Sequence, residues 1–268
     1  MKKLLNNENI VSCMFMIVLF IFRIITYNTM LKDNYILFNS INILGTIVCI
    51  LIIYVFLNKG SEDVIYSNKK GVNAFMIIMV IYSFTIYLLT YVIKFDMNFT
   101  INTALQVFLV VCILIMYPFG IKLSNFNWKI SFKEIIIIVL AFLCIKFPMV
   151  IFEGKWSLVY YSRFNGNNLG YIYYFFRVFI YPAFNEEVIF RGLLISGLSG
   201  YKISFYKINI IQSILFALAH FGVYNGLGLK AIIFMSIQGI MGFILGIIYK
   251  RTNSLTPCIL FHALLDIG

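Results

Sequence analysis

Long apolar segments, nearly all close to the ~20 residues that an α-helix needs to cross a bilayer, follow one another along almost the whole chain. They lie near residues 10–27, 35–57, 72–93, 101–121, 135–152, 171–195, 203–221, 229–249 and 255–267. Hydrophobic residues make up 62% of the 268 positions and charged residues only 12%, which excludes an ordinary soluble domain. We therefore predict an all-α, polytopic transmembrane helical bundle with about 8–9 spans.

The basic side chains flank these segments and form no continuous stripe, so the formal charge of +11 does not indicate a nucleic-acid partner. If the N-terminus is inside, twelve Lys and Arg fall in inner loops and only five in outer loops, namely Lys32, Lys94, Lys155, Arg163 and Lys230. The positive-inside rule then places the N-terminus in the cytoplasm. The wealth of Ile, Asn, Lys, Tyr and Phe is typical of an AT-rich genome and favours a bacterial cytoplasmic membrane.

The chain divides by the polarity of its spans. Residues 1–169 read as N-terminal transmembrane scaffold helices, because Arg23 and Lys146 are the only charges within their spans. Residues 170–268 hold polar side chains inside apolar segments, and we expect a four-helix catalytic core there. The boundary is expected in the loop Glu153–Gly170.

Two adjacent carboxylates and an arginine, Glu186, Glu187 and Arg191, lie within a segment apolar enough for a bilayer. A charge at the centre of a membrane helix costs roughly 2.5–3.5 kcal/mol on insertion scales, so such side chains normally pair, face a cavity or function. Glu187 and Arg191 stand four apart on one helical face, whereas Glu186 is rotated by about 100°. We expect Glu186 to be the freer carboxylate.

Both histidines of the chain, His220 and His262, follow in later apolar segments. Phe216 stands four residues before His220, so its ring is expected to pack beside the imidazole. Asp266 stands four residues after His262, close enough for both to contact one target. Three segments therefore each offer one polar face.

Other intramembrane hydrolase classes fit less well. The chain has no H-E-x-x-H pattern of a zinc metalloprotease. Ser199 precedes Gly200 and could suggest a serine protease, but Ser-Gly pairs are common in loops. Glu187, His220 and His262 would suit a catalytic zinc, although Arg191 would compete for the carboxylate. We expect no cofactor, with zinc as the alternative.

Three motifs taken together resemble those of the CPBP family of intramembrane proteases. They are Glu186-Glu187-x-x-x-Arg191, Phe216-x-x-x-His220 and His262-x-x-x-Asp266. This family is named for CAAX proteases and bacteriocin-processing proteins and is also called Abi. The resemblance implies that Glu186 is the general base with His220 as its partner, that Glu187 and Arg191 support them, and that His262 and Asp266 face the oxyanion. The family's third motif usually ends in Asn, whereas Asp266 can donate a hydrogen bond only when protonated; otherwise it would orient His262.

The expected function is thus an intramembrane endopeptidase that hydrolyses a membrane-associated peptide or protein through a water activated by Glu and His. The partners are this substrate and the lipid bilayer. Two alternatives stay open at this point. One is a non-enzymatic membrane adaptor or bacteriocin self-immunity protein, and the other is a proton-coupled carrier, since buried Glu, His and Arg also suit proton relays.

Overall fold

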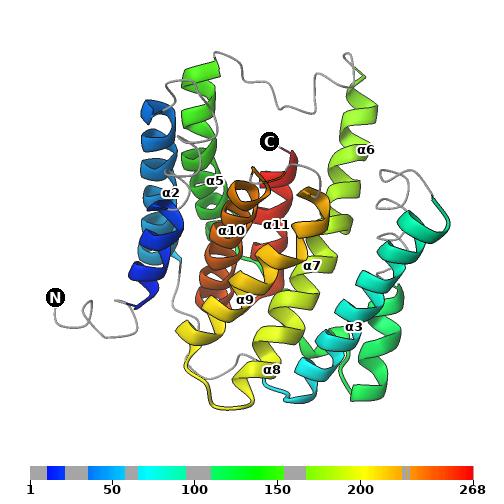
Figure 1. Cartoon of the computed structure of the whole chain (residues 1–268). Helices are drawn as coiled ribbons and strands as arrows, with labels where there is room; N and C mark the ends of the chain where they lie inside the picture. Colours follow the sequence, from blue (N-terminus) through cyan, green and yellow to red (C-terminus); the bar gives the residue numbers. More distant parts are fainter. Residues whose placement is uncertain are drawn as a thin grey trace.

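A computed structural model describes most of the chain, and every regular element in the described part is a helix (Figure 1). The described residues are 11–21, 36–57, 66–94, 110–153, 167–224, 228 and 230–267. The helices fall on the apolar segments of the sequence, which confirms the all-α class. The expected boundary loop lies mostly outside the described residues, so the division at 169/170 stays a prediction.

The N-terminal half supplies helices around the core. They are Val11–Ile21, α2 (Ile36–Phe56), α3 (Lys70–Tyr87) continued by η1 (Leu88–Val92), Val110–Phe119 and α5 (Phe132–Glu153). The helices α2 and α5 pack side by side, α5 also contacts the last helix of the chain, and α3 packs on the helix that follows the glutamate pair.

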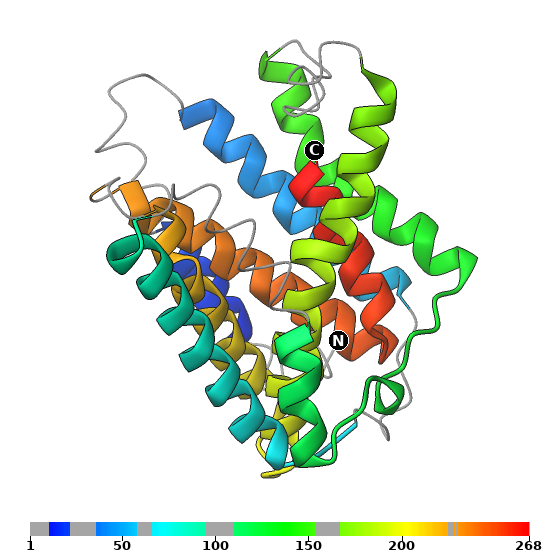
Figure 2. The same cartoon turned by 90° about the vertical axis from the view of Figure 1, so that its right-hand side faces the viewer.

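The C-terminal half forms the centre of the bundle. Its elements are α6 (Asn168–Val178), η5 (Phe179–Phe184), α7 (Asn185–Glu187), η6 (Val188–Ile195), α8 (Ser196–Ser199), α9 (Phe205–Ala219), η7 (Phe221–Tyr224), α10 (Lys230–Thr252) and α11 (Leu255–Ile267). Helix α10 packs against both α9 and α11. Figure 2 shows α11 running beside the long α6-to-α8 segment, in agreement with its contacts to α6, η5 and α7.

The α6-to-α8 segment bends just before the glutamate pair. Tyr181 has non-helical backbone angles (φ −149°, ψ 120°), and Pro182 follows it without a backbone N–H to donate. Helical geometry resumes at once, so Glu186 and Glu187 lie in the first turns after the bend. The bend therefore places both carboxylates near the start of a new helical stretch, whose backbone dipole favours negative charge.

Glycines bring α9 and α10 close together. A Cβ added to Gly242 would lie 3.2 Å from Phe216 Cβ, and one added to Gly246 would collide with the side chain of Asn209. Small residues of this kind let membrane helices approach until backbone and side-chain groups can hydrogen-bond across the interface. The G-x-x-x-G spacing thus faces α9, which carries Phe216.

A connection from the N-terminal half holds the start of α11. The Asn127 carbonyl accepts hydrogen bonds from Leu255 N (2.9 Å) and Ser254 Oγ (3.1 Å), and the Trp128 carbonyl accepts one from Thr256 Oγ1 (2.7 Å). The Trp128 ring also stacks on Phe184 at 5.4 Å between centroids. Residues 123–131, here called the anchor loop, therefore contact two of the segments that carry the polar motifs.

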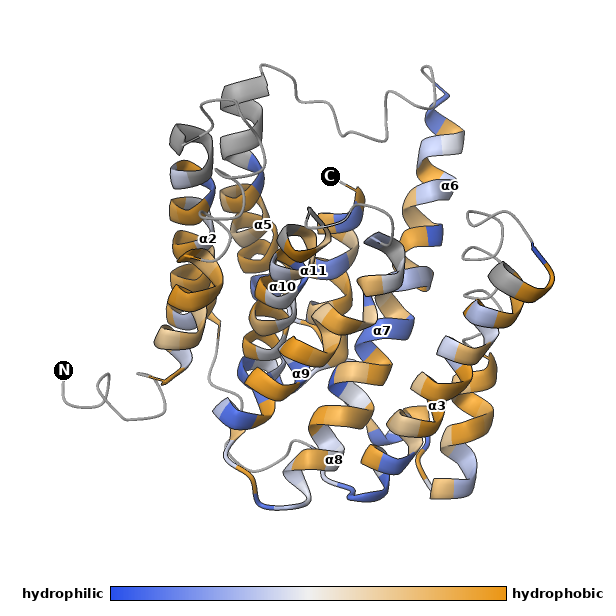
Figure 3. Ribbon diagram, in the orientation of Figure 1, coloured by the Kyte–Doolittle hydropathy of each residue, from blue (hydrophilic) through white to orange (hydrophobic). Residues whose placement is uncertain are grey.

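Hydrophobic residues make up most of the helical ribbon (Figure 3), and many large apolar side chains are exposed. Leu114 and Val80, for example, are 66% and 64% exposed, as expected of side chains that face lipid. Among the described residues, the helix Lys70–Tyr87 meets both the length and the apolarity of a full span. Shorter apolar helices are Val11–Ile21, Ser40–Phe56, Val110–Phe119, Phe205–Ala219 and Leu255–Ile267. The fold is that of a helical membrane bundle, and the number of 8–9 spans stays a prediction.

Candidate active site

Glu187 and Arg191 form a buried ion pair one helical turn apart. Arg191 Nη1 donates to Glu187 Oε1 at 2.9 Å, and both side chains are fully shielded from solvent. The other end of the guanidinium donates from Nη2 to the Gly242 carbonyl on α10 at 3.0 Å. Because burial of either charge alone would be unfavourable, the pair and its carbonyl partner stabilise each other.

His262 on α11 binds the same carboxylate oxygen. Its Nδ1 lies 2.8 Å from Glu187 Oε1, and because that oxygen only accepts, Nδ1 carries the hydrogen. The opposite nitrogen, Nε2, lies 3.8 Å from Glu186 Oε2 and 3.5 Å from Asp266 Oδ2. Two carboxylates thus face Nε2, so the favourable arrangement has a proton on Nε2 or on one of the facing oxygens.

His220 ends α9 with its ring turned toward Glu186. Its Nδ1 lies 2.8 Å from the Phe216 carbonyl, which can only accept, so Nδ1 donates and Nε2 is left as an acceptor in the neutral ring. This Nε2 lies 3.7 Å from Glu186 Oε2. The local hydrogen bond to the backbone of α9 therefore sets both the ring orientation and the tautomer.

The Phe216 ring packs among the charged and imidazole groups. Its centroid lies 4.7 Å from that of His220 and 5.9 Å from that of His262, and the Arg191 Cζ atom lies 4.9 Å from it. A fully buried aromatic ring at this position excludes water from the Arg191 side and offers the guanidinium a cation–π contact.

Exposure increases across the site from one side to the other. Glu187 and Arg191 are 0% exposed and His262 is 3% exposed, whereas His220, Glu186 and Asp266 reach 16%, 23% and 31%. Glu186 Oε2 is itself shielded and accepts no direct hydrogen bond from any residue that the structure describes. A substrate would therefore approach over Glu186, His220 and Asp266.

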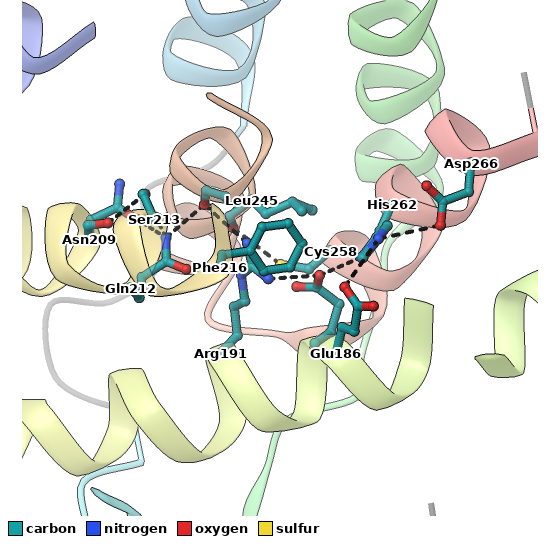
Figure 4. A network of polar contacts seen from close by, with 12 residues as sticks. Glu186, Arg191, Asn209, Gln212, Ser213, Phe216, Leu245, Cys258, His262 and Asp266 are labelled. Carbon is teal, nitrogen blue, oxygen red and sulfur yellow. Dashed lines mark hydrogen bonds and ion pairs between the residues drawn. The ribbon is translucent and has the colours of Figure 1, made fainter. Parts of the chain in front are cut away.

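The seven residues singled out in the sequence come together, and Figure 4 shows several of them in one row from Arg191 to Asp266. They lie on four elements, namely α7 and η6 for the first motif, α9 with its end for the second and α11 for the third. Their chemical roles stay predictions, since geometry alone does not assign a base or an acid.

A second buried polar group, not predicted from the sequence, lies next to the first. Asn209, Gln212 and Ser213 on α9 are buried, and Gln212 Nε2 donates to the Gly242 carbonyl that also accepts from Arg191. A usable signal was present, because these residues stand at i, i+3 and i+4 and so share one face of an apolar segment.

A metal ion has no evident set of ligands here. Within the described residues, no group of three or more His, Cys, Asp and Glu side chains has an arrangement able to hold one. Of the side chains considered for zinc, Glu187 is bound by Arg191 and His262, and His220 uses Nδ1 on a backbone carbonyl. The expectation of a reaction without a cofactor stays a prediction.

Comparison with known proteins gives a match for the C-terminal part of the chain. Residues 167–268 match the family model described as Rce1-like, type II CAAX prenyl endopeptidase Rce1-like. The matched part begins just before α6 and contains every residue of the three motifs. No curated protein and no solved structure matches the chain.

Proposed function

Since residues 167–268 belong to the Rce1-like group of CAAX-type intramembrane endopeptidases, we propose that Glu186 and His220 activate the water that cleaves the peptide bond. The observation that supports this most is the position of Glu186 Oε2, 3.7 Å and 3.8 Å from the Nε2 atoms of His220 and His262. These distances are too long for direct hydrogen bonds and suit a water between the groups.

The attacking water would donate one hydrogen to Glu186 Oε2 and the other to His220 Nε2. His220 can accept because its Nδ1 hydrogen is already donated to the Phe216 carbonyl. Glu186 takes the proton as the water oxygen bonds to the carbonyl carbon of the substrate. A positioned general base of this kind typically contributes about 10²–10⁴-fold to the rate.

The carbonyl oxygen becomes an oxyanion, and protonated His262 would donate to it from Nε2. The carboxylate of Glu187 supports the imidazolium through Nδ1, and Arg191 neutralises Glu187 in turn. Collapse of the tetrahedral intermediate breaks the C–N bond, and the proton on Glu186 passes to the leaving amine. One water is consumed, and a carboxylic acid and an amine result, without a covalent enzyme intermediate.

We propose a membrane-associated peptide or small membrane protein as substrate. The description of the matched family model names a CAAX prenyl endopeptidase. For a chain with a composition typical of AT-rich bacteria, peptide pheromone precursors and bacteriocin leaders are the better candidates. The exposed side of the site, at Glu186 and Asp266, would receive the scissile bond.

The test compares purified wild type with Glu186→Gln in proteoliposomes. The probes are a quenched-fluorescent farnesylated peptide with a CAAX terminus and a panel of synthetic bacteriocin and pheromone precursors. We expect Glu186→Gln to lose about 10²–10⁴-fold in kcat. Glu134→Gln is the matched control, because it makes the same change in a partly exposed carboxylate that caps α5, away from the site.

Equal cleavage by wild type and Glu186→Gln would refute the catalytic role. In cells, the membrane peptides of a wild-type strain are compared with those of a strain that carries Glu186→Gln. Cleavage products found in the wild-type strain alone identify the natural substrate. Full complementation by Glu186→Gln would favour the adaptor or self-immunity role instead. Proton-driven flux in proteoliposomes without peptide cleavage would favour the carrier.

A further inference from the structure

Three polar side chains of α9 form a buried cluster next to the ion pair of the site. Asn209, Gln212 and Ser213 lie on the face of α9 that meets α10, and Figure 4 shows them at the opposite end of the polar row from Asp266. All three side chains are at most 2% exposed. Polar groups so deeply buried in a membrane protein require partners and often have a functional reason.

The orientation of the Gln212 amide is fixed by its neighbours. Nε2 lies 2.7 Å from Asn209 Oδ1 and 2.7 Å from the Gly242 carbonyl, and both of these oxygens only accept. The Asn209 amide is itself oriented, because its Nδ2 donates to the Phe243 carbonyl at 3.1 Å. These two oxygens are therefore the nearest acceptors for the two hydrogens of Gln212 Nε2, and Ser213 Oγ lies farther away at 3.1 Å.

The Gly242 carbonyl joins this cluster to the site. It accepts from Gln212 on one side and from Arg191 Nη2 on the other, at 3.0 Å. Arg191 then donates to Glu187, whose Oε1 accepts from His262 Nδ1. An unbroken series of hydrogen bonds thus runs from the amide of Gln212 to the imidazole of His262.

Arg191 depends on this carbonyl for its orientation. Its Nε atom is buried and has no hydrogen-bond partner among the described residues, so the hydrogen bonds that orient the guanidinium come from its two terminal nitrogens. If the Gly242 carbonyl moved, Nη2 would lose its acceptor, and Nη1 and Glu187 would shift with it.

We propose that Gln212 is a positioning residue of the proteolytic reaction, holding the Gly242 carbonyl and through it Arg191, Glu187 and His262. This role rests on the proposed function, since it acts on the group that would face the oxyanion. Gln212 does not touch the substrate. Its removal should therefore slow the chemical step and leave substrate binding nearly unchanged.

A purely structural role of the cluster, as a link between α9 and α10, makes a different prediction. The hydrogen bond from Asn209 to Phe243 already joins these helices. If Gln212 only added to that link, its loss would lower the amount of folded protein, and the folded fraction would keep a normal kcat. Kinetics and histidine NMR on the folded protein separate the two roles.

The kinetic test uses the full chain in proteoliposomes with the peptide of the probe panel that the wild type cleaves. For Gln212→Met we expect kcat to fall about 10-fold and KM to stay within about twofold, because small displacements of catalytic groups are costly. Gln238→Met is the matched control, since the amide of Gln238 donates to Tyr224 and not to the Gly242 carbonyl. An equal fall in kcat for both variants, or an unchanged kcat for Gln212→Met, would overturn the proposal.

A second variant, Gln212→Asn, tests the same contact with a smaller change to the buried cluster. Gln212→Asn keeps an amide on α9 but draws its nitrogen back by one methylene from the Gly242 carbonyl and from Asn209 Oδ1. The same fall in kcat is expected. A normal kcat for this variant would contradict the need for the Gly242 contact.

The NMR test needs no substrate. The chain has two histidines, so ¹⁵N-histidine labelling gives signals from His220 and His262 alone. Gln212→Met should shift the Nδ1 signal of His262 and leave His220 in place, whereas an unmoved His262 signal would refute the link. If wild type cleaves no peptide at all, the proposed function fails, and the His262 signal still decides whether Gln212 orients this ring.

Discussion

Replacing Arg191 with methionine would leave the Glu187 carboxylate buried without its arginine. The structure gives Arg191 three contacts to lose, namely the ion pair at 2.9 Å, the hydrogen bond to the Gly242 carbonyl at 3.0 Å and the ring of Phe216 at 4.9 Å. Methionine fills a similar volume, so the loss is mainly electrostatic and no large cavity forms.

The expected loss is large because both partners are fully shielded. Breaking a buried ion pair by removing one partner typically lowers the free energy of unfolding by about 3–5 kcal/mol. Removing both charges avoids the unpaired carboxylate, so the double variant Glu187→Met/Arg191→Met should recover most of this loss. Both variants should be inactive, because Arg191→Met removes the hydrogen bond that fixes the Glu187 carboxylate, and the double variant also removes the acceptor of His262 Nδ1.

Equilibrium unfolding in mixed micelles, followed by far-ultraviolet circular dichroism, measures these differences. The informative quantity is the coupling energy of the double-mutant cycle over wild type, the two single variants and the double variant. A loss below about 1 kcal/mol for Arg191→Met, or a double variant less stable than either single variant, would refute the account of the pair as mutually stabilising.

Three further predictions follow from the same structure. Asp266→Asn should keep proteolysis, because an amide at 3.5 Å from His262 Nε2 can still orient the ring or donate to the oxyanion, and an inactive but folded variant would contradict this in the peptide assay. Treatment with EDTA or 1,10-phenanthroline should leave kcat unchanged if no metal takes part, and a loss restored by added Zn²⁺ would revive the zinc alternative. Gly246→Ala should lower the free energy of unfolding by about 1–3 kcal/mol, since its Cβ would collide with Asn209, whereas Gly222→Ala meets nothing within 4 Å and should be neutral in the same unfolding assay.

Helix placement could be predicted from the sequence because apolar length and helical spacing are local properties. The segment expected near 229–249 is α10 (Lys230–Thr252), and that near 255–267 is α11 (Leu255–Ile267). The pairing of Glu187 with Arg191 follows from the same rule, because residues four apart share one face of a helix.

Contacts between helices could not be predicted in this way. The bond from His262 Nδ1 to Glu187 joins residues 75 positions apart, and no spacing rule specifies which of two adjacent carboxylates an imidazole meets. The Gly242 carbonyl is a backbone group, so no residue type marks it as the acceptor for Arg191. Asn209, Gln212 and Ser213 share one helical face, but neutral amides and hydroxyls cost less to bury in an apolar segment than charges do, so they are a weaker indication of function.

The anchor loop has a consequence for how the protein can be divided. It hydrogen-bonds to the first turn of α11 through Asn127 and Trp128, and it lies outside residues 167–268. Expression of the matched part alone would deprive the Ser254 and Thr256 hydroxyls of their backbone acceptors in the anchor loop. The first turn of α11, the helix that carries His262, would then lose these hydrogen bonds. A minimal enzyme would therefore have to retain this short stretch, supplied in cis or as a co-expressed N-terminal fragment.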